Sequence, residues 1–182
     1  ILSTVGSTLE VKSTIGQGTT FCFELSYPYR TAGSGRSDAS ILSSDEPSLE
    51  HLGKALEGKH VLLVEDNEIN REISKRLLEK VGMIVSEAEN GQVACSMFDE
   101  SEVGGYDAIL MDIRMPVMDG YAATRHIRTS PRADARVVPL IAMTANAFVE
   151  DVKKSMDVGM TAYLSKPVDP LVLYRTLALH CR

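Results

Sequence analysis

The stretch "HVLLVEDNEIN" (residues 60–70) places four apolar residues directly before two acids. An apolar run of this kind is typical of a strand that is buried on both faces of a parallel sheet. Glu65 and Asp66 follow at once, and two carboxylates about 4 Å apart repel by about 4 kcal/mol at an effective dielectric near 20. We therefore expect these acids either to point into water or to have their charge offset by a cation.

Downstream of residue 59, short apolar runs alternate with segments of helical periodicity. The runs predict five strands, at 60–65, 83–88, 106–111, 137–143 and 161–165. Gly82 predicts the end of the first intervening helix, and Asn90 predicts the cap of the second. Asp169 followed by Pro170 predicts the start of the last helix. Five strands that alternate with five helices predict a doubly wound α/β domain over residues 59–182, with a parallel sheet covered on both faces.

Two regions of different composition precede this domain. Residues 1–27 contain the alternating segments "STLEVKS" and "TTFCFEL", joined by the turn "TIGQG", and this pattern predicts a β-hairpin. Residues 28–58 are rich in serine, glycine and proline, which predicts a flexible linker. A short helix is expected within this linker, near "SLEHLGKAL".

Composition and charge argue against several classes of protein. The net charge of −6 disfavours a nucleic-acid partner, and we interpret the arginine-rich stretch "RTSPRADAR" as a solvated loop. No apolar run approaches the ~20 residues that span a bilayer, so we expect no direct membrane contact. Cys22, Cys95 and Cys181 are scattered and odd in number, which favours reduced thiols in a cytoplasmic protein. Anchoring of a longer parent protein in the inner membrane stays open.

Polar side chains follow four of the five predicted strands, and they are Glu65, Asp66, Asp112, Thr144 and Lys166. Taken singly, each has an ordinary explanation as a loop residue, a helix cap or a surface charge. The carboxyl ends of parallel strands meet at one rim of the sheet, where ligands bind in this class of fold. Clustered carboxylates at such a rim predict a site for a hard cation such as Mg²⁺.

Four motifs carry a resemblance to a known family: "VLLVEDN", "DAILMDIRMPVMDGYAAT", "PLIAMTA" and "YLSKP". They resemble the receiver domain of two-component response regulators, especially the receivers fused to hybrid sensor histidine kinases. The resemblance covers residues 59–182 and implies the flavodoxin-like strand order 2-1-3-4-5. The segment "GSTLEVKSTIGQGTTFCFEL" is similar to the last hairpin of the histidine-kinase ATPase domain, so residues 1–27 are interpreted as a remnant of that domain.

The receiver resemblance implies a phosphorelay role for this chain. Asp112 would attack a phosphohistidine and become an acyl phosphate, which makes the chain a phosphoprotein of a signal-transduction system. Mg²⁺ would be held by Asp66, Asp112 and the backbone carbonyl of Arg114, with Glu65 acting through water. The implied partner is a histidine-kinase domain or a histidine-phosphotransfer domain. Phosphoryl transfer depends on positioning and on charge neutralisation, which a metal and a lysine can supply.

The same resemblance implies roles for residues after the fourth and fifth strands. Lys166 would pair with the phosphoryl oxygens, and the Thr144 hydroxyl would bond to them after transfer. Tyr163 would be the switch residue whose rotamer reports the state of Thr144. Lys166-Pro167 resembles the cis peptide of the family. Asn146 and Arg114 would flank the path of the hydrolytic water.

Three alternatives remain open from the sequence. A haloacid-dehalogenase-type hydrolase also uses an aspartate after a strand, but it needs a second aspartate two positions later, where this chain has Arg114. A degenerate receiver that serves only for docking is disfavoured because every site residue is present. Arg114 itself either covers the acyl phosphate or extends into solvent. We also leave open whether this chain, which would phosphorylate and dephosphorylate itself, counts as an enzyme.

Overall fold

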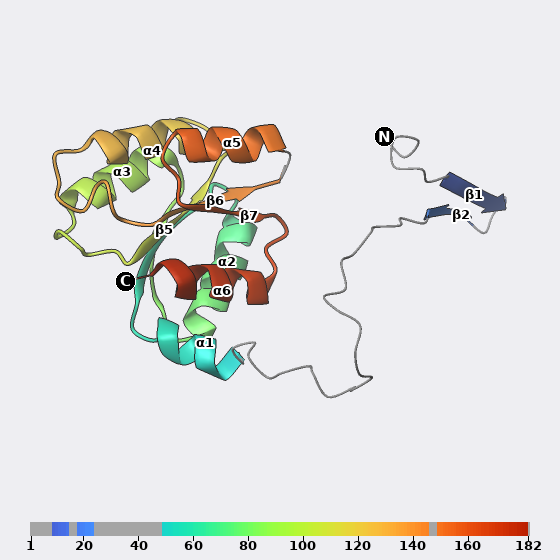
Figure 1. Cartoon of the computed structure of the whole chain (residues 1–182), viewed down its shortest axis with the longest axis horizontal. Coiled ribbons are helices and arrows are strands. Elements are labelled where there is room, and N and C mark those ends of the chain that lie inside the picture. Colours follow the sequence, from blue (N-terminus) through green and yellow to red (C-terminus); the bar gives the residue numbers. More distant parts are fainter. Residues whose placement is uncertain (1–8, 15–17, 24–48, 146–148, 182) are drawn as a thin grey trace, which may run out of the picture. The chain divides into compact units, whose positions relative to one another are not determined.

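The computed structural model describes residues 9–14, 18–23, 49–145 and 149–181, and the chain divides into two compact units, residues 1–43 and 44–182. The first unit contains two antiparallel strands, β1 (Leu9–Thr14) and β2 (Gly18–Phe23), with Leu9 opposite Phe23 (Figure 1). This pairing confirms the hairpin predicted from the alternating segments.

The second unit is built on a parallel sheet of five strands with the order β4-β3-β5-β6-β7. Counted within this unit, the order is 2-1-3-4-5, as the family resemblance implied. The strands are β3 (His60–Val64), β4 (Ile84–Ala88), β5 (Ala108–Asp112), β6 (Leu140–Thr144) and β7 (Ala162–Ser165).

Two strands, β5 and β6, begin two or more residues later than predicted, and local contacts occupy the residues before them. The prediction started the third strand at 106, but the carboxylate of Asp107 accepts a hydrogen bond from the backbone N–H of His60 at 2.8 Å. The prediction started the fourth strand at 137, but the N–H groups of Val137 and Val138 donate to the carbonyl of Asp134 and close a turn.

Helices cover both faces of the sheet (Figure 1). On one face lie α1 (Leu49–Leu56), α2 (Glu68–Lys80) and α6 (Pro170–His180). On the other face lie α3 (Gly91–Glu100), α4 (Gly120–Thr129) and α5 (Val149–Asp157). Each face has its own apolar core: Leu62, Met111 and Phe98 belong to the α3–α4 side, and Leu63, Leu110 and Leu177 to the α2–α6 side.

Three helix ends follow the predicted capping residues. The side chain of Asn90 accepts a hydrogen bond from the N–H of Val93, and that of Asp169 accepts one from the N–H of Val172, both at 3.0 Å. Gly82 follows α2 with a φ of +78°, the left-handed conformation that glycine adopts readily. These confirm the predicted starts of α3 and α6 and the predicted end of α2.

The helix α1 is packed onto the second unit although it falls in the segment predicted as a linker. Leu52 and Leu56 are 4% and 0% exposed and join the core on the α2–α6 side. The predicted short helix is therefore present, and the compact unit begins upstream of the predicted boundary at residue 59.

The arginine-rich loop after α4 is not simply solvated, and that interpretation was wrong for Arg132. Its guanidinium donates to the backbone carbonyls of Ser101 and Glu102 and pairs with Asp134 at 2.8 Å. It also lies 4.4 Å from the ring centroid of Phe98. Only 12% of the Arg132 side chain is exposed, so it fastens this loop to the end of α3.

No helix in the described part of the chain is both long and apolar enough to cross a membrane.

Candidate metal and phosphoryl site

Three carboxylates meet at the carboxyl ends of β3 and β5. Glu65 and Asp66 follow β3 directly, and Asp112 is the last residue of β5. One oxygen of each lies within 4.8 Å of the others. Glu65 is 1% exposed and Asp112 is 6% exposed, whereas Asp66 lies at the surface. The rim of the sheet thus concentrates negative charge on two buried carboxylates and one exposed carboxylate.

Lys166 bridges two of these carboxylates. Its Nζ lies 2.5 Å from Glu65 Oε2 and 2.6 Å from Asp112 Oδ2. Burial by itself lowers the pKa of Lys166, but the hydrogen bonds and charges of Asp112 and Glu65 outweigh it, so the pKa is raised. One ammonium faces three carboxylates, and the site keeps an excess of negative charge.

Two residues of α2 hold Glu65 in place, and the sequence analysis missed both. Asn70 Nδ2 donates to Glu65 Oε1 at 3.1 Å. Arg71 Nη1 donates to the backbone carbonyl of Glu65 at 2.7 Å. They lie in the first turns of α2, five and six residues after Glu65, and only this helical spacing could have indicated them.

The start of α4 and the loop before it approach Asp112 closely. A Cβ added to Gly120 would lie 2.2 Å from the backbone oxygen of Asp112, so only glycine fits there. The backbone N–H of Arg114 donates to Asp112 Oδ1 at 3.1 Å and fixes the orientation of that carboxylate. Val117 in the same loop has a φ of +68° and is 84% exposed, an uncommon conformation for a β-branched residue.

The other predicted site residues lie at the ends of β6 and on β7. Thr144 is 6% exposed at the end of β6, and its carbonyl accepts a hydrogen bond from the N–H of Lys166 at 2.8 Å. The Lys166-Pro167 peptide is cis, as the family resemblance implied. Tyr163 is 42% exposed on β7, so its ring faces solvent and is not enclosed in the acidic site. Asn146 lies outside the described residues.

The acidic cluster fits a small divalent cation. Its side-chain donors are all carboxylate oxygens from Glu65, Asp66 and Asp112, and hard cations such as Mg²⁺ prefer oxygen ligands while keeping several waters. Asp66 is exposed and leaves space for those waters. Such a cation would supply the positive charge that Lys166 alone does not.

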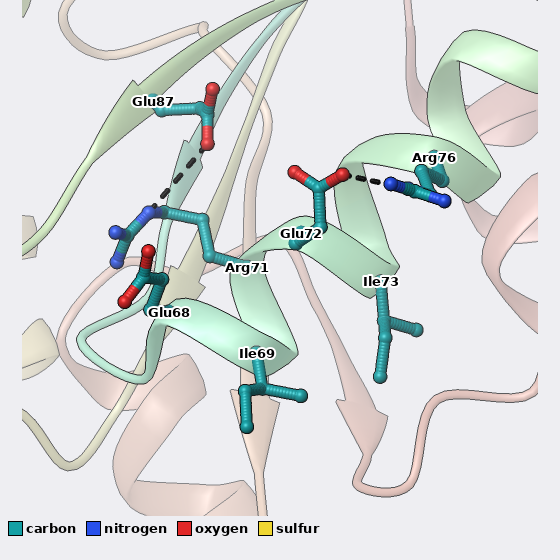
Figure 2. A pocket seen from close by; sticks show the side chains of 7 residues that line it. All are labelled: Glu68, Ile69, Arg71, Glu72, Ile73, Arg76 and Glu87. Carbon is teal, nitrogen blue, oxygen red and sulfur yellow. Dashed lines mark hydrogen bonds and ion pairs between the residues drawn. The ribbon is translucent and has the colours of Figure 1, made fainter.

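A cavity of about 460 Å³ joins this site to α2. Glu65, Lys166 and Ile73 are among the residues that line it. Ile73 also lines an outer cavity of about 490 Å³ on α2, shown in Figure 2, where Arg71 pairs with Glu87 and Arg76 pairs with Glu72. Ile69 and Ile73, one helical turn apart, are 71% and 55% exposed. An apolar surface bordered by charges therefore continues from the acidic site along α2.

Comparisons with known proteins agree with this geometry. The profile of the family described as "Response regulator receiver domain" matches residues 61–178. This chain is 36% identical to a probable histidine kinase 2 of Oryza sativa, in an alignment that covers 74% of this chain. It is 35% identical to hybrid signal transduction histidine kinase I of Dictyostelium discoideum, in an alignment that covers 82% of this chain. It is 33% identical to the aerobic respiration control sensor protein of Escherichia coli, in an alignment that covers 90% of this chain. The chain spans 13%, 9% and 19% of the lengths of these three relatives.

Solved structures show the same architecture. One is the receiver domain of a sensor histidine kinase from Pseudomonas aeruginosa, with a magnesium ion coordinated in its active site cleft. It is 41% identical, with a TM-score of 0.61 over 68% of this chain and 97% of that one. Another is a Saccharomyces cerevisiae receiver domain, crystallised with its histidine phosphotransfer signaling protein. It is 30% identical, with a TM-score of 0.61 over 69% of this chain and 90% of that one.

Proposed function

The chain belongs to the response regulator receiver domain family, and from this premise we propose that Asp112 accepts a phosphoryl group from a phosphohistidine. A carboxylate oxygen of Asp112 bonds to phosphorus while the bond from phosphorus to the histidine nitrogen breaks. The histidine is released and Asp112 carries an acyl phosphate. The observation that supports this role is the position of Asp112 beside Lys166 and two further acids at the carboxyl end of the sheet.

The neighbouring residues would neutralise and position the transferred group. Asp66, Asp112 and the backbone carbonyl of Arg114 would hold Mg²⁺, with Glu65 acting through water, and the ion would supply positive charge to the phosphoryl oxygens. The Lys166 ammonium lies within hydrogen-bond distance of Asp112 and would pair with those oxygens as they arrive. This arrangement favours phosphoryl transfer chiefly by placing charge, as that reaction requires.

A switch would follow from the new phosphoryl group. The Thr144 hydroxyl would bond to it, and Tyr163, now exposed on β7, would turn inward behind Thr144. Both residues lie on adjacent strands that pair in parallel, so a change at one can reach the other directly. The exposed surface of β7 would then differ between the two states.

The partner that best fits is a histidine-phosphotransfer domain or a histidine-kinase domain. The yeast structure shows a related receiver in complex with a histidine phosphotransfer protein. In this chain, Ile69 and Ile73 form an exposed apolar strip on α2 (Figure 2). Ile73 also lines the cavity that contains Glu65 and Lys166. A helix of the partner packed on this strip would carry its histidine toward Asp112.

The relatives indicate the larger protein in which this module works. The match to the Escherichia coli sensor covers 90% of this chain, so it must extend upstream of residue 61, where the receiver match begins. This coverage supports our proposal that β1 and β2 are the last hairpin of a histidine-kinase ATPase domain. We place the chain in a cytoplasmic part of a hybrid histidine kinase within a two-component phosphorelay.

Acetyl phosphate with Mg²⁺ tests the proposal directly. We expect intact-mass spectrometry to detect one added phosphoryl group on the wild-type protein and none on the Asp112→Asn variant, whose circular dichroism should match the wild type. Labelling that persists in the variant would contradict the assignment of Asp112. Absence of labelling in both proteins would favour a docking-only receiver, and sustained turnover of a phosphomonoester would favour a hydrolase.

A further inference from the structure

A second cavity reaches the phosphoryl site from the opposite face of the sheet. It measures about 220 Å³, and its lining residues are Ile113, Arg114, Asp119, Tyr121, Thr144 and Lys154. The cavity that contains Glu65 and Lys166 lies on the α2–α6 side, whereas this one lies between α4 and α5. Arg114 and Thr144 belong to the proposed phosphoryl site, and Lys154 is a cation to which that proposal gives no role.

Lys154 rests on an aromatic ring. Its Nζ lies 4.4 Å from the centroid of the Tyr121 ring, which is itself 7% exposed. The Lys154 side chain is exposed to water, and a cation–π contact in that setting is weak. The carboxylate of Asp119, in the same cavity, already accepts a hydrogen bond from the N–H of Ala122 at 2.7 Å as the cap of α4. Lys154 therefore gives up little when it leaves the ring.

Phosphorylation changes the charge next to this cavity. Glu65, Asp66 and Asp112 carry three formal negative charges against one positive charge on Lys166, and a divalent cation balances the remainder. An acyl phosphate replaces the single charge of the Asp112 carboxylate with a charge of about −2 on the phosphoryl oxygens. One negative charge is then left over beside this cavity, where Arg114 and Lys154 are the two cationic lining residues that can face it.

We propose that Lys154 is a phosphoryl-binding residue of the phosphorylated state. When Asp112 carries the phosphoryl group, the Lys154 ammonium leaves the Tyr121 ring and pairs with the phosphoryl oxygens across this cavity. A charge-assisted hydrogen bond to phosphate is stronger than an exposed cation–π contact, so the exchange is favourable. The inference rests on the proposed function of Asp112.

The expected consequence is a longer-lived acyl phosphate. In hydrolysis, a water oxygen bonds to phosphorus, the bond from phosphorus to the Asp112 oxygen breaks, and the carboxylate is restored as phosphate leaves. An ammonium that lies over the phosphoryl oxygens on the α4–α5 side hinders the approach of water from this cavity. Because Lys154 lies on α5, the same contact draws α5 toward the site.

The test compares Lys154→Gln with Lys153→Gln, an exposed lysine beside it on α5. Each protein is phosphorylated with acetyl phosphate and Mg²⁺, the donor is removed, and the loss of phosphoryl mass is followed. We expect the acyl phosphate of Lys154→Gln to decay about three- to fivefold faster than that of the wild type, which is the effect expected when one exposed charge contact is lost. The acyl phosphate of Lys153→Gln should decay at the wild-type rate. Equal decay rates for Lys154→Gln and the wild type would overturn the role of Lys154 while leaving Asp112 assigned. Failure of the wild type to take up the group would overturn both proposals.

A second measurement reports the movement of the lysine itself. Beryllofluoride with Mg²⁺ mimics the phosphoryl group, and the ring resonances of Tyr121 can be followed by NMR. We expect them to shift in the wild-type protein as the ammonium leaves the ring and to shift less in Lys154→Gln, where no ammonium is present. The same shift in both proteins would contradict the exchange.

Discussion

The two ends of the parallel strands both pair a lysine with acids, but they do so with opposite charge balance. At the amino ends, Lys59 lies 3.1 Å from Asp107, with side chains 31% and 24% exposed. At the carboxyl ends, Lys166 lies 2.6 Å from Asp112, with side chains 19% and 8% exposed. Asp107 is also satisfied by the backbone N–H of His60, whereas Asp112 shares its lysine with Glu65.

This difference separates a structural ion pair from a reactive one. At the amino ends, the positive charge of one lysine balances the negative charge of one acid. Their contact links the residues just before β3 and β5. At the carboxyl ends the acids outnumber the lysine and are more deeply buried, which is costly unless a cation is added. The surplus of buried charge thus marks the end of the sheet that binds a metal and reacts.

The largest effect should come from removing the lysine of the buried cluster. Lys166→Ala removes the ammonium that pairs with the buried carboxylates of Glu65 and Asp112, and we expect a loss of about 3 kcal/mol in unfolding free energy. Urea denaturation in EDTA at pH 7 would measure it. Because pairing raises the pKa of Lys166 in the folded protein, its contribution is complete below about pH 10.4, the unfolded value, and fades as the pH rises through the folded pKa. A loss below 0.5 kcal/mol would show that the cluster is not effectively buried.

A substitution of similar size but steric origin is Gly120→Ala. Its new Cβ would meet the backbone oxygen of Asp112 at 2.2 Å, so we expect a loss of about 2 kcal/mol in unfolding free energy and a displaced Asp112 backbone. Gly53→Ala in α1 is the matched control, because the nearest atom lies 4.0 Å from the added Cβ. That control should gain up to about 1 kcal/mol from helix propensity. Thermal melts would contradict the close approach if both variants behaved alike.

Metal addition should give a smaller, saturable effect. Mg²⁺ at ten times its dissociation constant should stabilise the fold by about 1.4 kcal/mol through mass action. Differential scanning calorimetry with and without Mg²⁺ measures the shift, and Asp66→Ala should reduce it by removing one ligand. An equal shift in both proteins would place the metal elsewhere.

The smallest effect should come from the balanced pair. Lys59→Ala should cost about 0.5 kcal/mol, and the cost should fall at high salt because the pair is partly exposed. Urea denaturation at low and high salt would detect both. A cost equal to that of Lys166→Ala would remove the contrast between the two ends of the sheet.

The strands and the acidic rim could be predicted because they depend on local patterns. Apolar runs identify β3, β5 and β6 directly, and the residue after each run must lie at the carboxyl rim of a parallel sheet. The helix caps at Asn90 and Asp169 could likewise be predicted, because each side chain accepts a hydrogen bond from a backbone N–H only three residues later.

The contacts that could not be predicted join residues far apart in the chain. The sequence around Arg132 is typical of a charged surface loop. In the structure, however, the guanidinium is held by hydrogen bonds to backbone carbonyls just after α3, about thirty residues away in the chain. The approach of Lys154 to Tyr121 depends on how α4 and α5 pack, and no sequence spacing specifies it. Asn70 and Arg71 lie close to Glu65 in sequence, but their roles require the exact direction in which α2 begins.

The packing of α1 has a consequence for the exchange of receivers between signalling proteins. Leu52 and Leu56 are as deeply buried as the strand residues of the core, although they lie upstream of the family match. A chimaera joined at residue 59 would open an apolar surface on α6 and would inherit a foreign sequence in its place. Recombination that keeps the module intact must therefore carry the segment from Leu49 onward, which makes α1 part of the unit that evolution or an engineer can transplant.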